Sequence, residues 1–247
     1  MLKFAVAVML FSLSASAVAQ CLPVSTEQPL PKGPLTIAKI EFVRNDIFDL
    51  QAPNALWFHR FANQYHVVTT EGTLRDDVLF VEGDTLDPTE LAETERLLRS
   101  RRYLRHAEVT VSHYCAEQSA VIVTVKSWDN WSLLPKIDIG HEGGETKTSI
   151  GFAEDNLLGS GNQLQAEYYN DSERDGFQLR FVSPNIFGHH WRTSMFYADN
   201  SDGESYLFNL EKPFYRLNSE RAYGFTMAKT IKDISEYTLG DEVNEYQ

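Results

Sequence analysis

The chain has 247 residues, a formal net charge of −13 and a sequence pI near 4.9. So acidic a chain is not expected to bind nucleic acid, because a phosphate-binding surface requires clustered Lys and Arg. Four arginines between Arg99 and Arg105 form the one basic cluster, and they lie at the end of a predicted helix, where positive charge is favourable without any ligand.

Residues 1–19 have the organisation of a secretory signal peptide. Lys3 supplies a positive charge, a short apolar run follows it, and Ala-Val-Ala at 17–19 is the small-x-small pattern that signal peptidase cleaves. We expect the mature chain to begin near Gln20, without a lipid anchor on Cys21, because lipoprotein signals carry Gly, Ala or Ser before that cysteine. No later run approaches the roughly 20 apolar residues of a spanning helix, so any membrane crossing is expected to use strands.

Two cysteines, Cys21 and Cys115, both remain after signal cleavage and enter an oxidising compartment. We expect a disulfide between them, since metal binding or thiol chemistry would need a CxxC pair or neighbouring ligands, which the sequence lacks. The N-terminal tail of residues 20–34 would then be pinned to the domain that follows it.

The domain predicted over residues 35–127 begins with a strand that runs from Ile37 to Val43 and is closed by Asn45. The next element is an amphipathic helix that Asn54 is placed to cap. Its apolar stripe repeats every four residues and consists of Trp57, Phe61 and Tyr65. We expect this stripe to pack on the strand layer.

A second helix is predicted to begin at residues 87–90, which combine a capping aspartate, a proline suited to the first helical position and capping-box spacing. Its buried side contains Leu91, Leu97 and Leu98. Apolar and polar residues then alternate over 107–111 and again over 121–125. A polar turn between Cys115 and Ser119 joins these two strands as a hairpin.

The order β-α-α-β-β and two sequence segments resemble a known family of domains. The segments NQYHVVTTEGTLRDDVLFVEGDTLD and LAETERLLRSRRYLRHAEVTV resemble a POTRA domain of the outer-membrane assembly and secretion barrel superfamily, also called bacterial surface antigens. The Gly83-Asp84 turn and the Glu95-Arg96 and Leu98-Arg99 pairs resemble that family's domain closest to the barrel. The resemblance implies an α+β POTRA domain (βααββ) over residues 35–127, in front of a barrel.

Residues 128–247 are predicted to form antiparallel transmembrane β-barrel strands. Apolar and polar residues alternate, as in strands that face lipid on one side and a wet lumen on the other. The clearest runs are 163–168, 177–181 and 223–228. This length has room for about seven or eight strands. That is fewer than the barrels of the superfamily contain, so we expect the chain to be the N-terminal part of an incomplete barrel.

Two sets of turns alternate along this region, with a period of roughly 29 residues. One set is rich in Gly, Pro and apolar residues, at 156–159, 184–188 and 212–214. The other set is acidic and polar, at 141–146, 170–175, 199–204 and 232–242. We expect the two sets at opposite ends of the strands. The first set resembles the family's periplasmic turns, so the acidic set would face outside.

Aromatic residues in this region suit the interfacial girdles of such a barrel. They are Trp191, Tyr197, Tyr206, Phe208, Phe214 and Tyr215. A soluble β-sandwich with an aromatic core is the alternative, but it explains neither the two alternating classes of turn nor the order of a signal sequence followed by a POTRA-like domain. Trp128 and Trp131 lie at the junction, where we expect them to pack the domain against the barrel rim.

No catalytic constellation is recognised: the sequence lacks a GxSxG elbow, a GxxxxGK[ST] loop and an HExxH helix. Gly159-Ser160-Gly161 is interpreted as a turn, not a phosphate cradle. Six of the seven histidines are considered as possible ligands; they lack nearby acidic or thiol partners in the sequence and are interpreted as surface, packing or turn residues. They are His59, His66, His106, His113, His189 and His190. We therefore expect no enzyme activity, no cofactor and no metal site.

Two functional classes fit these features. In the first, an outer-membrane protein captures unfolded outer-membrane or secreted polypeptides by adding them as a strand to its periplasmic POTRA domain, and the barrel inserts or translocates them. The capturing edge is expected at Arg105 to Ser112 or in its hairpin partner. In the second class, the protein is an outer-membrane channel or surface receptor, and the POTRA domain only supports it.

The resemblance favours the first class. Its partners would be unfolded polypeptides and outer-membrane lipid, with no nucleic acid and no nucleotide. The superfamily ties transport to an Arg-bearing motif in a loop inside the lumen, and this motif has no counterpart before Gln247.

Overall fold

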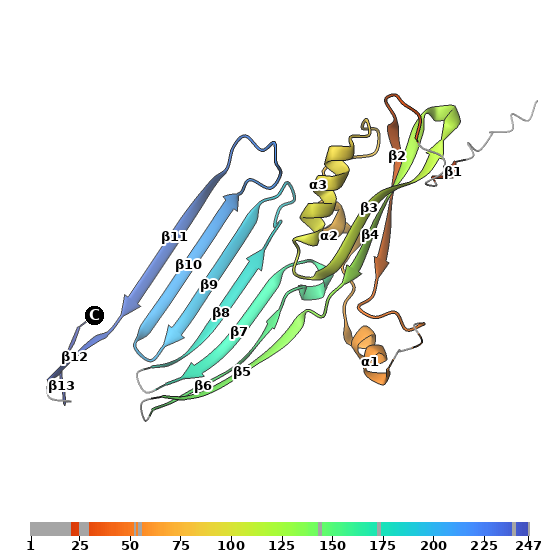
Figure 1. Cartoon of the computed structure of the whole chain (residues 1–247). Coiled ribbons are helices and arrows are strands. Elements are labelled where there is room, and N and C mark those ends of the chain that lie inside the picture. Colours follow the sequence, from red (N-terminus) through yellow and green to blue (C-terminus); the bar gives the residue numbers. More distant parts are fainter. Residues whose placement is uncertain are drawn as a thin grey trace, which may run out of the picture.

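The computed structural model describes residues 21–24, 30–51, 53, 56–142, 145–171, 174–238 and 241–246. The signal peptide of residues 1–19, Gln20 and the helix cap expected at Asn54 lie outside the described residues. Figure 1 shows two parts, an α+β domain and, beyond it, a long antiparallel sheet. The last strand of the domain leads into the first strand of this sheet through residues 130–132 alone.

The α+β domain contains a four-stranded sheet in the order β1-β3-β4-β2. Its strands are β1 (Leu22–Pro23), β2 (Thr36–Asn45), β3 (Leu104–Cys115) and β4 (Ala120–Asp129). β3 and β4 form the predicted hairpin around the 3-10 turn Ala116–Gln118, and β2 runs parallel to β4. Because β2 pairs with the free side of β4, β4 is a central strand and β3 lies at the edge along most of its length.

Helices α2 (Glu71–Arg75) and α3 (Pro88–Arg99) contribute to the core on one face of this sheet. α3 begins where its sequence predicts, because the Asp87 side chain caps its first turn. Leu74 of α2 and Leu98 of α3 are fully buried together with the inward-facing valines of β4. The short helix α2 was not predicted, since five residues are too few to show a periodic stripe.

Helix α1 (Trp57–Tyr65) is present, but the prediction that its stripe packs on the strand layer is wrong. Trp57, Phe61 and Tyr65 are 81%, 52% and 65% exposed, and Ala62 is the one buried residue of the helix. The physical reason is that α2 and α3 already supply the helical residues of the core, to which α1 contributes none. A four-residue repeat shows that a helix has an apolar face without showing what that face contacts.

The second part is a seven-stranded antiparallel sheet in which each strand pairs with its neighbours in the sequence. Its strands are β5 (Leu133–Glu142), β6 (Glu145–Glu154), β7 (Gln163–Asn170), β8 (Asp175–Ser183), β9 (Arg192–Asn200), β10 (Gly203–Lys212) and β11 (Tyr223–Lys232). Within the described chain, β5 and β11 are the two outer strands and do not pair with each other.

The predicted alternation of apolar and polar residues is confirmed by the register of this sheet. Leu164 pairs with Phe181, Ala166 with Leu179 and Tyr168 with Phe177, so these side chains share one face. The same face carries Ile137, Ile150, Met195, Phe208 and Met227 on the other strands. We call it the apolar face. The opposite, polar face carries side chains such as Lys136, Gln165, Glu167, Gln178 and Asn209.

The two sets of turns lie at opposite ends of the strands, as predicted. The Gly, Pro and apolar turns all lie at the end next to the α+β domain, and the first three acidic turns lie at the far end (Figure 1). The prediction of a fourth acidic turn over 232–242 is wrong. That segment instead forms most of a separate hairpin of β12 (Ile234–Thr238) and β13 (Asp241–Tyr246). Across the described ranges, no helix is both long and apolar enough to cross a membrane.

Candidate functional site: the open edge of β3 and the domain junction

The outer edge of β3 is the first feature with functional potential. β1 pairs with β3 only at His113 and Tyr114, and Val24 N–H donates to the Ser112 carbonyl at 2.9 Å. From Arg105 to Val111, no strand of the described chain pairs with this side of β3. The expected edge at residues 105–112 is therefore present, whereas its hairpin partner is the central strand β4 and offers no edge.

Two side chains of α3 occupy part of this edge. The Val109 N–H donates to Glu95 Oε2 at 2.9 Å, and Arg99 Nε donates to the Ala107 carbonyl at 2.8 Å. Glu95 and Arg99 also form an ion pair at 2.8 Å, one helical turn apart. They occupy a donor and an acceptor that an added β-strand would use. We call Glu95 and Arg99 the α3 clasp. The sequence indicated only favourable charge at the end of a helix.

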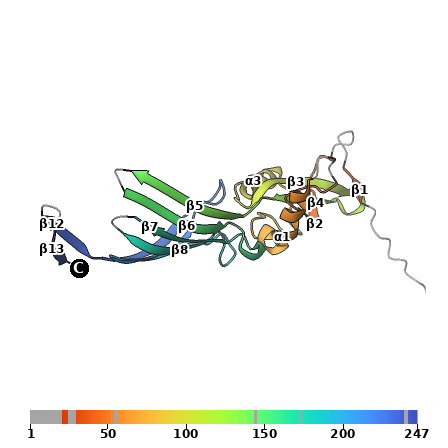
Figure 2. The ribbon, with the colours of Figure 1, turned by 90° about the horizontal axis from the view of Figure 1, so that it is seen from below.

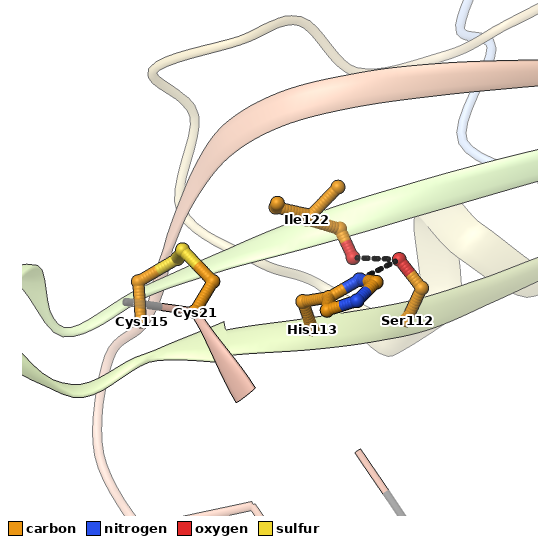
Figure 3. Close-up of a disulfide and its surroundings, with 5 residues drawn as sticks. All are labelled: Cys21, Ser112, His113, Cys115 and Ile122. Atoms are coloured by element: carbon orange, nitrogen blue, oxygen red, sulfur yellow. Dashed lines mark hydrogen bonds between the residues drawn. A yellow bond between two sulfur atoms is a disulfide. The ribbon is translucent and has the colours of Figure 1, made fainter. Parts of the chain in front are cut away.

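The disulfide Cys21–Cys115 closes the far end of the same edge (Figure 3). The two Cα atoms are 4.1 Å apart, and the residues are separated by 94 positions in the sequence. The bond holds β1 against the last residues of β3, where the Ser112 hydroxyl donates to the Ile122 carbonyl at 3.2 Å. The open stretch of the edge is thereby limited to the segment between Arg105 and Val111.

A buried polar network connects the domain to the second sheet. Asp129, at the end of β4, is fully buried; its Oδ2 accepts bonds from the Thr69 N–H at 2.7 Å and hydroxyl at 2.9 Å, and contacts His66 Nε2 at 2.8 Å. Asn156 Nδ2 donates to the Thr69 hydroxyl at 2.9 Å, and Asn156 Oδ1 accepts from the Gly161 N–H at 2.8 Å. The expectation that His66 lacks an acidic partner is wrong, because folding brings in Asp129 from 63 residues away.

The first domain-side turn fits tightly against the domain. The Gly159 carbonyl accepts from the Thr70 N–H at 2.9 Å, and φ is +75° at Gly159 and +69° at Gly161. A Cβ on Gly161 would lie 2.7 Å from the Tyr103 ring. Both glycines therefore serve the turn, as predicted, and their close approach to the domain explains why larger residues would not fit.

The other two domain-side turns also contact the domain. Asn185 Nδ2 donates to the Asp76 carbonyl at 3.1 Å, and the Leu217 N–H donates to Glu93 Oε1 on α3 at 3.2 Å. His190 stacks on Tyr215 with ring centres 3.8 Å apart. Burial lowers the pKa of His190 to about 4, so its imidazole is neutral near pH 7.

The end of α3 and the polar face border a partly open cavity of about 370 Å³. Its lining includes Arg96, Arg101, Tyr103, Gly161, Gln163 and Arg192. Burial disfavours the charge of Arg101, but its hydrogen bonds to Asp77 outweigh burial and raise its pKa. Because Arg96 and Arg192 are also paired, with Glu93 and Glu211, the cavity offers little uncompensated positive charge.

The two tryptophans expected at the junction behave differently. Trp131 lies in a depression beside Tyr65 and Leu133, at the base of the second sheet. Trp128 packs on His106 of β3, with ring centres 5.2 Å apart, so it stabilises the domain's own sheet. The ring contact of Trp128 therefore lies within the domain's own sheet and not at the junction, where it was expected.

These features define a class of architecture: a small α+β domain fixed by a polar junction to one end of a meandering antiparallel sheet with an apolar and a polar face. No family model and no curated protein matches the chain. Among solved structures, the chain is similar to BamA from Haemophilus ducreyi lacking POTRA domains 1-3, with a TM-score of 0.50 and 15% identity. The match covers 72% of this chain and 31% of that one.

A second similar structure is CdiB from Acinetobacter baumannii, with a TM-score of 0.48 and 12% identity over 80% of this chain and 40% of that one. BamA and CdiB are Omp85-family outer-membrane β-barrel proteins. The chain spans less than half the length of either structure. At this level of identity, the likeness to BamA shows the fold alone.

Proposed function

We propose that this protein is an outer-membrane β-barrel protein that assists the membrane insertion or translocation of other polypeptides. Its α+β domain is a periplasmic POTRA domain, and it binds an extended client as an added strand on the outer edge of β3. The observation that carries the proposal is the unpaired stretch from Arg105 to Val111 of β3, in a domain fixed to the base of a sheet with two chemically distinct faces.

The apolar face supports a membrane location. Ile137, Ile139, Ile150, Phe225 and Met227 are all more than half exposed on it. A soluble protein rarely exposes so large an apolar patch, because transferring it out of water is favourable. In a membrane the same residues would contact lipid, and the polar face would line a wet interior. The domain-side turns would then be periplasmic.

Strand addition explains how such a protein would act without being an enzyme. The client's main-chain N–H and C=O groups bond to the edge strand, so its side-chain sequence is largely free to vary. The partners are unfolded outer-membrane or secreted polypeptides and outer-membrane lipid, and neither nucleic acid nor nucleotide takes part. The α3 clasp occupies two of the edge groups, so a client has to displace Glu95 and Arg99 to pair along the whole edge.

The second candidate is a channel or surface receptor in which the domain is only a support. Two observations favour it: the α3 clasp already satisfies part of the edge, and the buried network around Asp129 fixes the domain to the sheet. Depleting the protein from cells separates the candidates. An assembly factor should leave other outer-membrane barrels poorly folded, whereas loss of a channel should change only solute uptake.

Site-specific photocrosslinking tests the binding edge directly. A photoreactive residue at Thr110, which is exposed on β3, should trap client chains in cells. The matched control is Lys39, which is exposed on the opposite edge strand β2 of the same sheet. Equal trapping at the two positions, or none at Thr110, would contradict strand addition at β3.

A further inference from the structure

Helix α1 presents an aromatic stripe that the proposed strand addition does not use. Trp57, Phe61 and Tyr65 lie along one side of the helix, with the Phe61 and Tyr65 rings 4.6 Å apart. On another side, Asn63 fixes the helix to the chain by donating to the Phe48 carbonyl at 2.8 Å and accepting from its N–H at 3.1 Å. The stripe is therefore exposed while another side of the helix is attached to the chain at Phe48.

The stripe is continuous with the apolar face of the second sheet. Tyr65 at its end lines a depression together with Trp131, Leu133 and Leu158. Leu133 begins the row of β5 side chains that continues with Ile137 on the apolar face. The depression thus joins the helix to the side of the sheet that would contact lipid.

α3 lies toward the other side of the sheet. Its C-terminal end borders the cavity that is lined by Gln163, Val182 and Arg192 of the polar face. Figure 2 shows α1 and α3 separated from each other at the base of the sheet. Of these two helices, only α1 is placed where the apolar face ends, at the level of the domain-side turns.

The residue types on the stripe fit a membrane–water interface. Trp and Tyr concentrate there because their rings are apolar while the indole N–H and phenol O–H remain hydrated. Arg60 is exposed beside Trp57 and is suited to lipid phosphate. A helix of nine residues is about 14 Å long, too short to span a bilayer but long enough to lie in its surface.

We propose that α1 is an interfacial helix, whose stripe of Trp57, Phe61 and Tyr65 inserts into the headgroup and upper acyl region of the periplasmic leaflet. The inference rests on the proposed membrane location of the apolar face. The α+β domain is already connected to the second sheet through β4 and the junction. The helix would attach the domain to the membrane directly. Such an attachment fixes how the open edge of β3 is presented to clients.

Depth-dependent fluorescence quenching tests this inference on the full chain. The protein is reconstituted into phosphatidylethanolamine–phosphatidylglycerol vesicles whose acyl chains carry bromine either near the headgroup or near the chain end. A variant with W128F, W131F and W191F reports on Trp57 alone. A variant that retains only Trp128 is the matched control within the domain. L179W, added to a variant without other tryptophans, reports on the apolar face.

The expected result is shallow quenching at α1: bromine near the headgroup should quench Trp57 at least roughly twofold more than bromine near the chain end. The L179W indole should show the reverse order, and Trp128 should respond to neither. Replacing Phe61 and Tyr65 with Ser should abolish the quenching of Trp57. Both residues are exposed, so this variant should fold normally.

The outcomes separate this inference from the proposed function. Quenching of L179W without quenching of Trp57 would overturn the interfacial helix and leave the membrane location intact. Quenching of Trp57 without quenching of L179W would support the helix and overturn the barrel assignment, and quenching of neither would overturn both. Acrylamide quenching of Trp57 is also measured without vesicles at increasing protein concentration. If raising the protein concentration alone protects Trp57 from acrylamide, a second copy of the protein covers the stripe and the inference is wrong.

Discussion

Removing the α3 clasp should strengthen client binding, even though it removes favourable contacts from the protein. In the free protein, Glu95 accepts from the Val109 N–H at 2.9 Å and Arg99 donates to the Ala107 carbonyl at 2.8 Å. A client strand needs the same two groups, so it has to exchange these bonds for its own. In the double variant E95A R99A, the edge groups are already open and bonded only to water.

The size of the effect follows from the two bonds. A hydrogen bond of this kind contributes about 0.5 to 1.5 kcal/mol net, so the clasp contributes about 1 to 3 kcal/mol in total. The partly exposed Glu95–Arg99 ion pair adds at most a few tenths of a kcal/mol. Since about 1.4 kcal/mol is a factor of ten, the double variant should bind a client roughly 5- to 150-fold more tightly.

The assay is fluorescence anisotropy with a labelled peptide that has the sequence of β8, Asp175–Ser183, whose alternating pattern is that of a barrel strand. E95Q retains an acceptor for Val109 and should fall between the wild type and the double variant. R96A is the control, because Arg96 pairs with Glu93 on the same helix and is not one of the two side chains that bond to the edge of β3. Unchanged or weaker binding by E95A R99A would refute the idea that the clasp competes with clients.

Four further outcomes are expected. C21S C115S should lower the free energy of unfolding by up to about 4.7 kcal/mol, the chain-entropy estimate for a loop of 94 residues, and an unchanged urea midpoint would contradict it. D129A should lower the free energy of unfolding by about 3 to 5 kcal/mol, because it leaves buried hydrogen-bond partners at Thr69 and His66 unsatisfied. A decrease below about 1 kcal/mol would show that water replaces the carboxylate. G161A should lower the melting temperature, because its Cβ would meet the Tyr103 ring at φ +69°, whereas G140A, with open space around it, should have a much smaller effect. The unfolded chain takes up a proton on His190 near pH 6.5 and the folded chain only near pH 4, so stability should fall as the pH drops through this window, and H190Q should flatten that slope in pH-dependent denaturation.

The features predicted best from the sequence are those encoded over a few neighbouring residues. The strands β7, β8 and β11 were recognisable because a sheet with one apolar and one polar face imposes a period of two on the sequence of its strands. The cap at Asp87 and the glycines at 159 and 161 were recognisable because their chemistry is local. These signals were sufficient to predict that consecutive strands form hairpins and that the two sets of turns lie at opposite ends of the sheet.

The features that were missed depend on residues distant in sequence. The Asp129–Thr69 bonds span 60 residues, and neither position carries a motif that indicates its partner. The outward stripe of α1 has the same period as a buried one, so only the packing of α2 and α3 shows that it is exposed. The α3 clasp has the spacing of an ordinary helical ion pair, and its role depends on Val109 of β3, whose N–H lies within hydrogen-bond distance of Glu95.

Amide hydrogen exchange on β3, with and without client, tests the central claim most directly. The Val109 N–H points to the outer edge, and by strand alternation so do those of Ala107 and Val111, whereas the Thr110 N–H points toward β4. If the client adds as a strand, the amides of Ala107, Val109 and Val111 should gain protection, while Thr110, already within the ladder, should change little. Protection confined to the polar face of the second sheet, with β3 unchanged, would contradict strand addition and favour the channel.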